Sequence, residues 1–183
     1  KLNDGIGEYL CALPILQSMP GYRAYHMTHH RLAGTREDPD LVMTEQYPVR
    51  AASLRRKLLR DVSGLTGIKS IIGLMGMAAG YWKYELTGKI ERVQPAPQGV
   101  LGYAAVFVRN NGHIALLWQA GMASVLAWLG NGWLYLLWVA AFLFILPICM
   151  RIRQIADHAV VADAFSTNPL QHARTSQANW LEK

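Results

Sequence analysis

The stretch that decides the fold is residues 110–150, which read NNGHIALLWQAGMASVLAWLGNGWLYLLWVAAFLFILPICM. These 41 residues contain no aspartate, glutamate, lysine or arginine. The whole chain of 183 residues is 52% hydrophobic and only 16% charged, a low share of charge for a water-soluble protein. Because a soluble core does not need so long an uncharged run, the sequence predicts an all-α, integral membrane protein.

Two apolar segments, residues 113–129 and 133–150, fill most of this stretch. They contain 17 and 18 residues, close to the roughly 20 that a helix needs to cross the hydrocarbon core. The sequence Gly130-Asn131-Gly132 between them favours a turn with positive φ, so we expect one transmembrane helical hairpin. Arg109 precedes the hairpin and Arg151 follows it, whereas the turn is uncharged, and the positive-inside rule therefore places both ends in the cytoplasm.

A third apolar segment, residues 64–82, is not expected to cross the membrane. It contains Lys69 and five glycines, which weaken a helix, and basic residues flank it on both sides. We expect an interfacial or re-entrant segment on the cytoplasmic side. The chain is then a single membrane domain, in which residues 1–62 and 151–183 are cytoplasmic and residues 113–150 form the hairpin.

The net charge is +6, and the basic residues gather beside the apolar segments and in the run Arg55-Arg56-Lys57. In these places they can meet anionic headgroups, so membrane lipids are an expected partner and nucleic acid is not. Cys11 and Cys149 lack metal or redox spacing and are expected to be reduced packing residues.

Three histidines form the pattern His-x-x-His-His at His26, His29 and His30. On a helix, positions i and i+3 share a face and i+4 lies beside them, so the three imidazoles converge on a small volume. Neutral imidazole is a good donor for transition metals, so the pattern predicts a metal site. The alternative interpretation is a solvated, histidine-rich helix end.

The motif and its surroundings resemble the membrane fatty acid desaturases, which carry three histidine boxes around a di-iron centre. Residues 22–30, YRAYHMTHH, look like the second box. Ile155-Ala156-Asp157-His158 resembles the Glu-His element after the hairpin in that family, with Asp157 in place of the more usual glutamate. Further similar segments are Gly34-Thr35, Asp38-Pro39-Asp40-Leu41, RRKLLRD at 55–61, GLTG at 64–67, Ala173-Arg174-Thr175 and ANWLE at 178–182.

This resemblance implies O₂-dependent desaturation of fatty acyl chains at a centre of two iron ions, with O₂ as co-substrate. The implied partners are a fatty acyl lipid substrate and an electron donor of ferredoxin or cytochrome b5 type. The first box is expected before Asn3 and the third after Lys183, so we expect a fragment that is inactive alone. Similarity to bacterial members implies the bacterial inner membrane, with the metal site on the cytoplasmic side.

The resemblance also implies a set of site residues. The expected iron ligands are His26, His29, His30 and His158. Candidates to orient the ligand rings are Asp38, Asp40 and Gln154. Asp38 before Pro39 also has the pattern of a helix N-cap, which is the main alternative for that residue. The alternative for His158 is a histidine at the level of the lipid headgroups.

Three other functions stay open. A related membrane di-iron hydroxylase of alkanes, carotenoids or sphingolipids would use similar histidine boxes. A transporter or a non-redox metal-binding membrane protein would be expected to need a charged residue inside the hairpin, and the hairpin has none. A degenerate scaffold would keep only part of the metal site.

Overall fold

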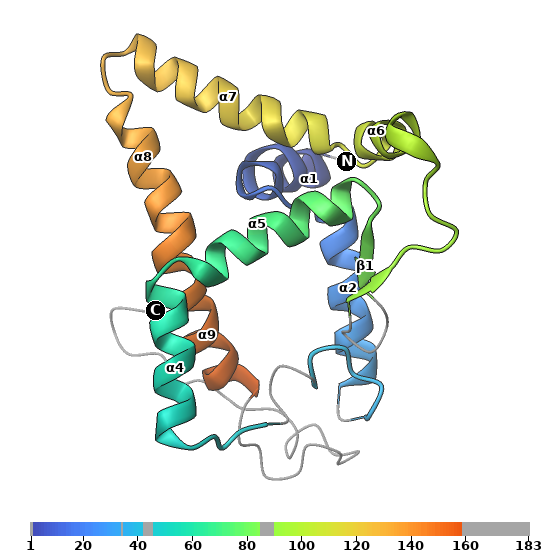
Figure 1. Cartoon of the computed structure of the whole chain (residues 1–183), viewed down its shortest axis with the longest axis vertical. Coiled ribbons are helices and arrows are strands. Elements are labelled where there is room, and N and C mark those ends of the chain that lie inside the picture. The colour runs from blue at the N-terminus through green and yellow to red at the C-terminus, as the bar shows by residue number, and fades with distance from the viewer. Residues whose placement is uncertain (1, 34, 42–45, 85–89, 159–183) are drawn as a thin grey trace.

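The computed structural model describes residues 2–33, 35–41, 46–84 and 90–158, and for Tyr84, Asp157 and His158 it describes the backbone alone (Figure 1). In this part of the chain the structure is mostly helical, as predicted. The helices are α1 (Leu2–Gly5), η1 (Ile6–Ala12), η2 (Leu13–Ile15), α2 (Met19–Leu32), α4 (Ala51–Val62), α5 (Leu65–Ala78), α6 (Gly99–Arg109), α7 (Gly112–Trp128), α8 (Trp133–Ala140), η3 (Ala141–Ile145) and α9 (Leu146–His158).

Two short strands depart from the all-α prediction. β1 (Trp82–Tyr84) and β2 (Ile90–Arg92) pair antiparallel, with Trp82 opposite Arg92 and Tyr84 opposite Ile90. A strand of three residues is too short to show the period of two that identifies a strand in sequence. The apolar segment that was expected to reach residue 82 therefore ends as a helix at Ala78 and continues as a strand.

One helical stretch is long and apolar enough to cross a membrane among the residues described, namely Trp133–Ala156. Its most apolar window of 18 residues has a mean hydropathy of 2.3, and its 24 residues extend about 36 Å, more than the roughly 30 Å of hydrocarbon. The helix passes Pro147 by way of the wider π-helical turn η3, at the place where the proline lacks an N–H and crowds the preceding turn. It continues past Met150 to His158.

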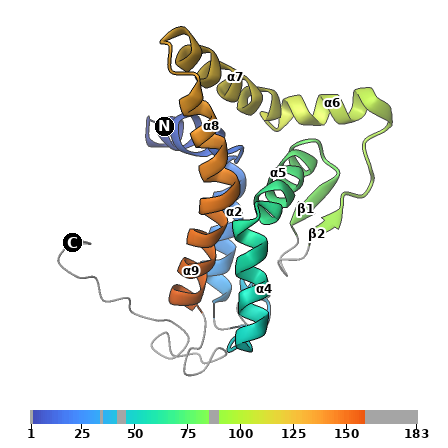
Figure 2. The same ribbon diagram turned by 60° about the vertical axis from the view of Figure 1, so that its left-hand side comes forward.

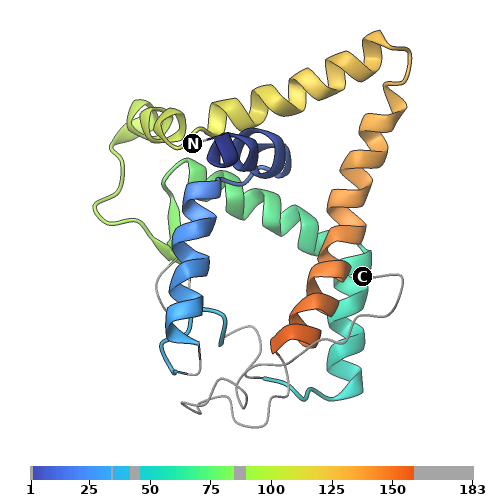
Figure 3. The ribbon, with the colours of Figure 1, turned by 180° about the vertical axis from the view of Figure 1, so that it is seen from behind.

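The turn of the expected hairpin lies where the sequence predicts it. Gly130 has a φ of +74°, and the Asn131 side-chain amide donates to the carbonyl of Leu129 at 3.1 Å. Figures 1 and 3 show α7 and α8 meeting at a corner and diverging from it. Because α7 has only 17 residues, the structure shows one candidate span in the described chain, and the membrane hairpin itself is not shown.

Helix α5 packs against the long helix through glycine. At Gly67 a Cβ would lie 2.5 Å from the carbonyl oxygen of Leu143, so only a glycine lets the two backbones approach this closely. Gly64, with a φ of +79°, makes the turn from α4 into α5. The 14 residues of α5 extend about 21 Å, which is too short to cross the hydrocarbon core.

The helical turns of the opening segment end with η2 at Ile15. Leu13 is buried there, and the Gln119 side chain of α7 donates to the carbonyl of Pro14 at 2.6 Å. Helices α2, α4 and α9 all extend to the same side of α5 (Figure 2). The histidine motif of α2 is therefore carried on the same side as the charged end of the long helix.

Candidate metal centre

Helix α2 presents the histidine motif, and its first turn is stabilised from outside the helix. Ser18 stands at the N-cap but makes no capping hydrogen bond. Instead, the carboxylate of Glu8 in η1 accepts the backbone N–H of Met19 at 2.5 Å. A negative charge is favourable at this positive end of the helix dipole. Glu8 is only 8% exposed, and the sequence analysis missed it because nothing local marks a residue that caps another helix.

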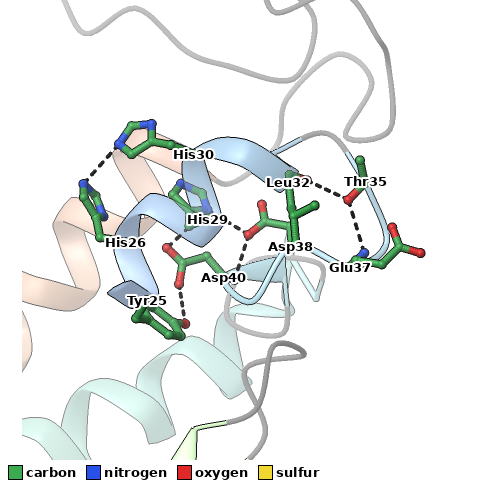
Figure 4. Close-up of polar contacts among 9 residues, drawn as sticks. All are labelled: Tyr25, His26, His29, His30, Leu32, Thr35, Glu37, Asp38 and Asp40. Atoms are coloured by element: carbon green, nitrogen blue, oxygen red, sulfur yellow. Dashed lines mark hydrogen bonds and ion pairs between the residues drawn. The ribbon is translucent and has the colours of Figure 1, made fainter. Parts of the chain in front are cut away.

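The three histidine rings gather at the C-terminal half of α2, as the spacing predicts (Figure 4). Ring centroids are 4.5 Å apart for His26 and His30, 5.4 Å for His29 and His30, and 6.0 Å for His26 and His29. The Nε2 atoms of His26 and His30 are 3.1 Å apart. His29 is buried, while His30 is exposed to solvent.

Two aspartates from the loop after α2 hold His29. Its Nδ1–H donates to Oδ1 of Asp38 at 2.7 Å, and Oδ2 of Asp40 lies 3.5 Å from the same nitrogen. The Tyr25 hydroxyl donates to the other oxygen of Asp40 at 2.6 Å. This network fixes the ring and leaves Nε2 of His29 as the nitrogen that can bind a metal ion.

The two interpretations of Asp38 turn out to be compatible. Its Oδ1 also accepts the backbone N–H of Asp40 at 2.9 Å, which is the hydrogen bond of a cap that precedes Pro39. One carboxylate oxygen therefore organises the loop and holds His29. The sequence analysis did not single out Tyr25, although it lies inside the quoted motif and one position before His26.

The surroundings move the pKa values of two histidines in opposite directions. The hydrogen bond to Asp38 raises the pKa of His29 against the opposing effect of burial. Burial lowers the pKa of His26, and the neighbouring His30, His29 and Arg153 lower it further. A lowered pKa keeps the His26 ring neutral at physiological pH, which is the form that binds metals.

The spacing of two histidine nitrogens fits a bound transition metal ion, but the set of ligands around such an ion is incomplete. Two nitrogens bound to one ion at 90° and about 2.1 Å each would be about 3.0 Å apart, close to the 3.1 Å between His26 and His30. Within the described chain, however, no group of three or more His, Cys, Asp and Glu residues closes around one point. The side chain of His158 lies outside the described residues.

Helix α9 carries two further residues of interest. Charge repulsion from Arg153 contributes to the lowered pKa of His26. Gln154 is half-buried on the same helix, one turn before His158. The roles predicted for Gln154 and His158 stay predictions, because the ring of His158 is not described.

An ion pair that sequence reasoning missed joins α9 to α4. The Arg151 Nη2 donates to Oδ1 of Asp61 at 3.0 Å, and its Nε donates to Oδ2. The Thr66 hydroxyl donates to Asp61 Oδ1 at 2.6 Å. The two charged residues are 90 positions apart, so no local spacing could reveal the pair.

In the part of the chain that the structure describes, fold and site together define a class of protein that is mainly helical, with one candidate membrane span and a cluster of three histidines on one helix. The family model of fatty acid desaturases matches residues 1–183, the whole chain. The chain belongs to the fatty acid desaturase family, which confirms the resemblance seen in the sequence. Membership implies a membrane-bound oxidoreductase. No curated protein and no solved structure matches the chain.

Proposed function

We propose that this chain is part of an O₂-dependent fatty acyl desaturase in which His26, His29 and His30 bind iron of a di-iron centre. The observation that carries the proposal is the state of His29. Its ring is buried and its Nδ1 is held by Asp38 at 2.7 Å in a partly buried network, and this is how proteins commonly fix the tautomer of a histidine that binds metal through its other nitrogen.

When bound, the iron supplies the oxidising chemistry with O₂ that an unactivated methylene group requires. The protein residues have simpler tasks. Asp38 and Asp40 keep the ring of His29 in place, and Tyr25 keeps Asp40 in place. We propose His158 as a further ligand from α9, with Gln154 holding its ring.

The proposed substrate is a fatty acyl lipid, and the proposed electron donor is of ferredoxin or cytochrome b5 type. An acyl chain is apolar, so helices embedded in the membrane are its natural binding place. The uncharged run followed by Arg151 and Arg153 supports a metal site on the cytoplasmic side of a bacterial inner membrane.

The experiment is to replace His29 with Ala in the complete protein and to measure iron content and acyl products in membranes. We expect iron content to fall and desaturation to be lost, because a missing ligand costs more than a missing supporting residue. Thr28→Ala is the matched control, since Thr28 is a half-buried neighbour whose hydroxyl donates to the carbonyl of Ala24.

Normal iron content and product yield in the His29→Ala variant would contradict the proposal. Hydroxylated instead of unsaturated acyl products from the wild-type protein would contradict desaturation while leaving the iron ligands in place. A wild-type protein that binds no iron would favour the degenerate scaffold.

A further inference from the structure

An open cavity of about 620 Å³ lies between the C-terminal end of α5, the β-hairpin and α6, where these elements adjoin in Figure 1. Its walls are largely apolar and include Met77, Trp82, Pro97 and Val106. Helices α5 and α6 are held together beside it by a hydrogen bond of 3.1 Å from the Asn110 side chain to the carbonyl of Ala78. No residue of the histidine cluster lines the cavity, so it is a separate site.

Two cations line this apolar cavity, Lys83 from β1 and Arg109 from the end of α6. Both are exposed, and neither forms an ion pair among the described residues. None of the described lining residues is acidic. The cavity therefore offers an apolar wall and two positive charges to one ligand, a combination that is complementary to an anionic amphiphile.

The cavity adjoins elements with apolar surfaces. Helix α5, which contributes Met77 to the cavity wall, packs at Gly67 on Leu143 of the candidate span. Helix α6 presents Val100 and Leu101 with 85% and 86% of their surfaces exposed. Apolar side chains in this state are stabilised when lipid covers them.

Aromatic residues beside the cavity are of the kind found at a membrane interface. The rings of Tyr81 and Tyr103 stack at 4.1 Å between centroids, and the indole of Trp82 lies on the cavity wall next to them. Tyrosine and tryptophan are enriched where the hydrocarbon core meets the headgroups. Aromatic, basic and apolar side chains thus meet in one cavity, as they do at lipid-binding surfaces.

We propose that this cavity binds an anionic phospholipid of the bilayer, with the phosphate between Lys83 and Arg109 and an acyl chain along Trp82 and Val106. The lipid joins α5, the β-hairpin and α6, three elements that contribute few buried side chains of their own. The site is separate from the metal centre, because none of its lining residues belongs to the histidine cluster.

The test is native mass spectrometry of the complete protein in detergent, titrated with phosphatidylglycerol and, separately, with phosphatidylcholine. We expect the wild-type protein to prefer phosphatidylglycerol and the Lys83→Ala/Arg109→Ala variant to bind it about 30-fold more weakly. This factor corresponds to about 2 kcal/mol for two basic residues near an anionic lipid. Arg92→Ala is the matched control, because Arg92 is an exposed cation of the same β-hairpin that does not line the cavity.

Equal binding of both lipids by the wild-type protein would overturn the proposal, as would an equal loss in the Arg92→Ala control. Retained iron content in the double variant is expected and separates this site from the metal centre. A Trp82→Phe variant gives a second measurement, since phosphatidylglycerol with brominated acyl chains should quench less fluorescence in it than in the wild type. An unchanged quenching amplitude would also contradict the proposal.

Discussion

Arg151 donates hydrogen bonds from two nitrogens to the carboxylate of Asp61 and so joins the end of the long apolar helix to α4. Asp61 is fully buried, and the side chain of Arg151 is 16% exposed. A bidentate guanidinium–carboxylate pair fixes orientation as well as distance. The pair therefore fixes the end of the apolar helix against α4.

Removing one partner of this pair is expected to destabilise the protein strongly. In an Asp61→Asn variant Arg151 would keep its charge in a mostly buried place without a counter-ion, at a cost of about 3–5 kcal/mol. Thermal unfolding in detergent, followed by circular dichroism, measures the effect. Arg56→Gln on the exposed side of the same helix is the control and is expected to change stability by less than about 0.5 kcal/mol.

The same pair predicts a dependence of stability on pH. Burial alone would raise the pKa of Asp61, but hydrogen bonds from Arg151 and Thr66 outweigh it and hold the pKa below its ordinary 3.8. The stabilisation is therefore fully present above the unfolded-state pKa and is lost as pH falls through the lower folded-state pKa. The stability difference between wild type and Asp61→Asn should shrink on acidification below about pH 4. A difference that stays constant from pH 7 to pH 3 would refute this assignment.

The features that could be predicted from the sequence are those that residues close together in the chain determine. The spacing of His26, His29 and His30 fixes their shared position on α2 whatever surrounds it. The turn at Gly130 depends on a residue that accepts positive φ, and the continuation of α9 past Met150 depends on the absence of a helix-breaking residue.

The rest depends on contacts between distant segments, which one sequence does not display. Asp61 lies in a basic run and gives no sign of its partner 90 residues away. The carboxylate of Glu8 caps a helix that begins eleven residues later. Strand β1 begins only at the last residue of the apolar segment 64–82, and β2 and α6 lie outside the three apolar segments.

The role of Asp38 at His29 is open to a direct test. Asp38→Asn keeps the shape of the side chain but removes the charge that supports the ring, so we expect iron affinity to fall about 10- to 100-fold. Asp40→Asn should cost less, because its oxygen lies 3.5 Å from the ring nitrogen rather than 2.7 Å. Iron content after dialysis against a weak chelator ranks the variants. The exposed neighbour Glu37→Gln serves as control, and a loss in that control equal to the loss in Asp38→Asn would contradict the role of Asp38.

Two glycines of α5 should respond in opposite ways to alanine. A Cβ at Gly67 would lie 2.5 Å and 2.6 Å from backbone atoms of Leu143, so Gly67→Ala should destabilise by about 1–3 kcal/mol. A Cβ at Gly73 meets nothing within 4 Å, so Gly73→Ala should stabilise by up to about 1 kcal/mol through helix propensity. The test compares the melting temperatures of the two variants with that of the wild type in the same detergent. Shifts in the same direction would disprove the close packing of α5 on the long helix.

The last prediction concerns His158 as an iron ligand from α9. The backbone of α9 remains helical to this residue, so His158 lies eight residues or about 12 Å past Met150. Helices α2 and α9 extend to the same side of α5, as Figures 1 and 2 show. We expect His158→Ala to lower iron stoichiometry and to abolish desaturation in the complete protein. Asp157→Ala is the control, since the adjacent position points about 100° away on the helix. Normal iron content in the His158→Ala variant, together with loss in the His29→Ala variant, would leave α2 as the only source of iron ligands among the described residues.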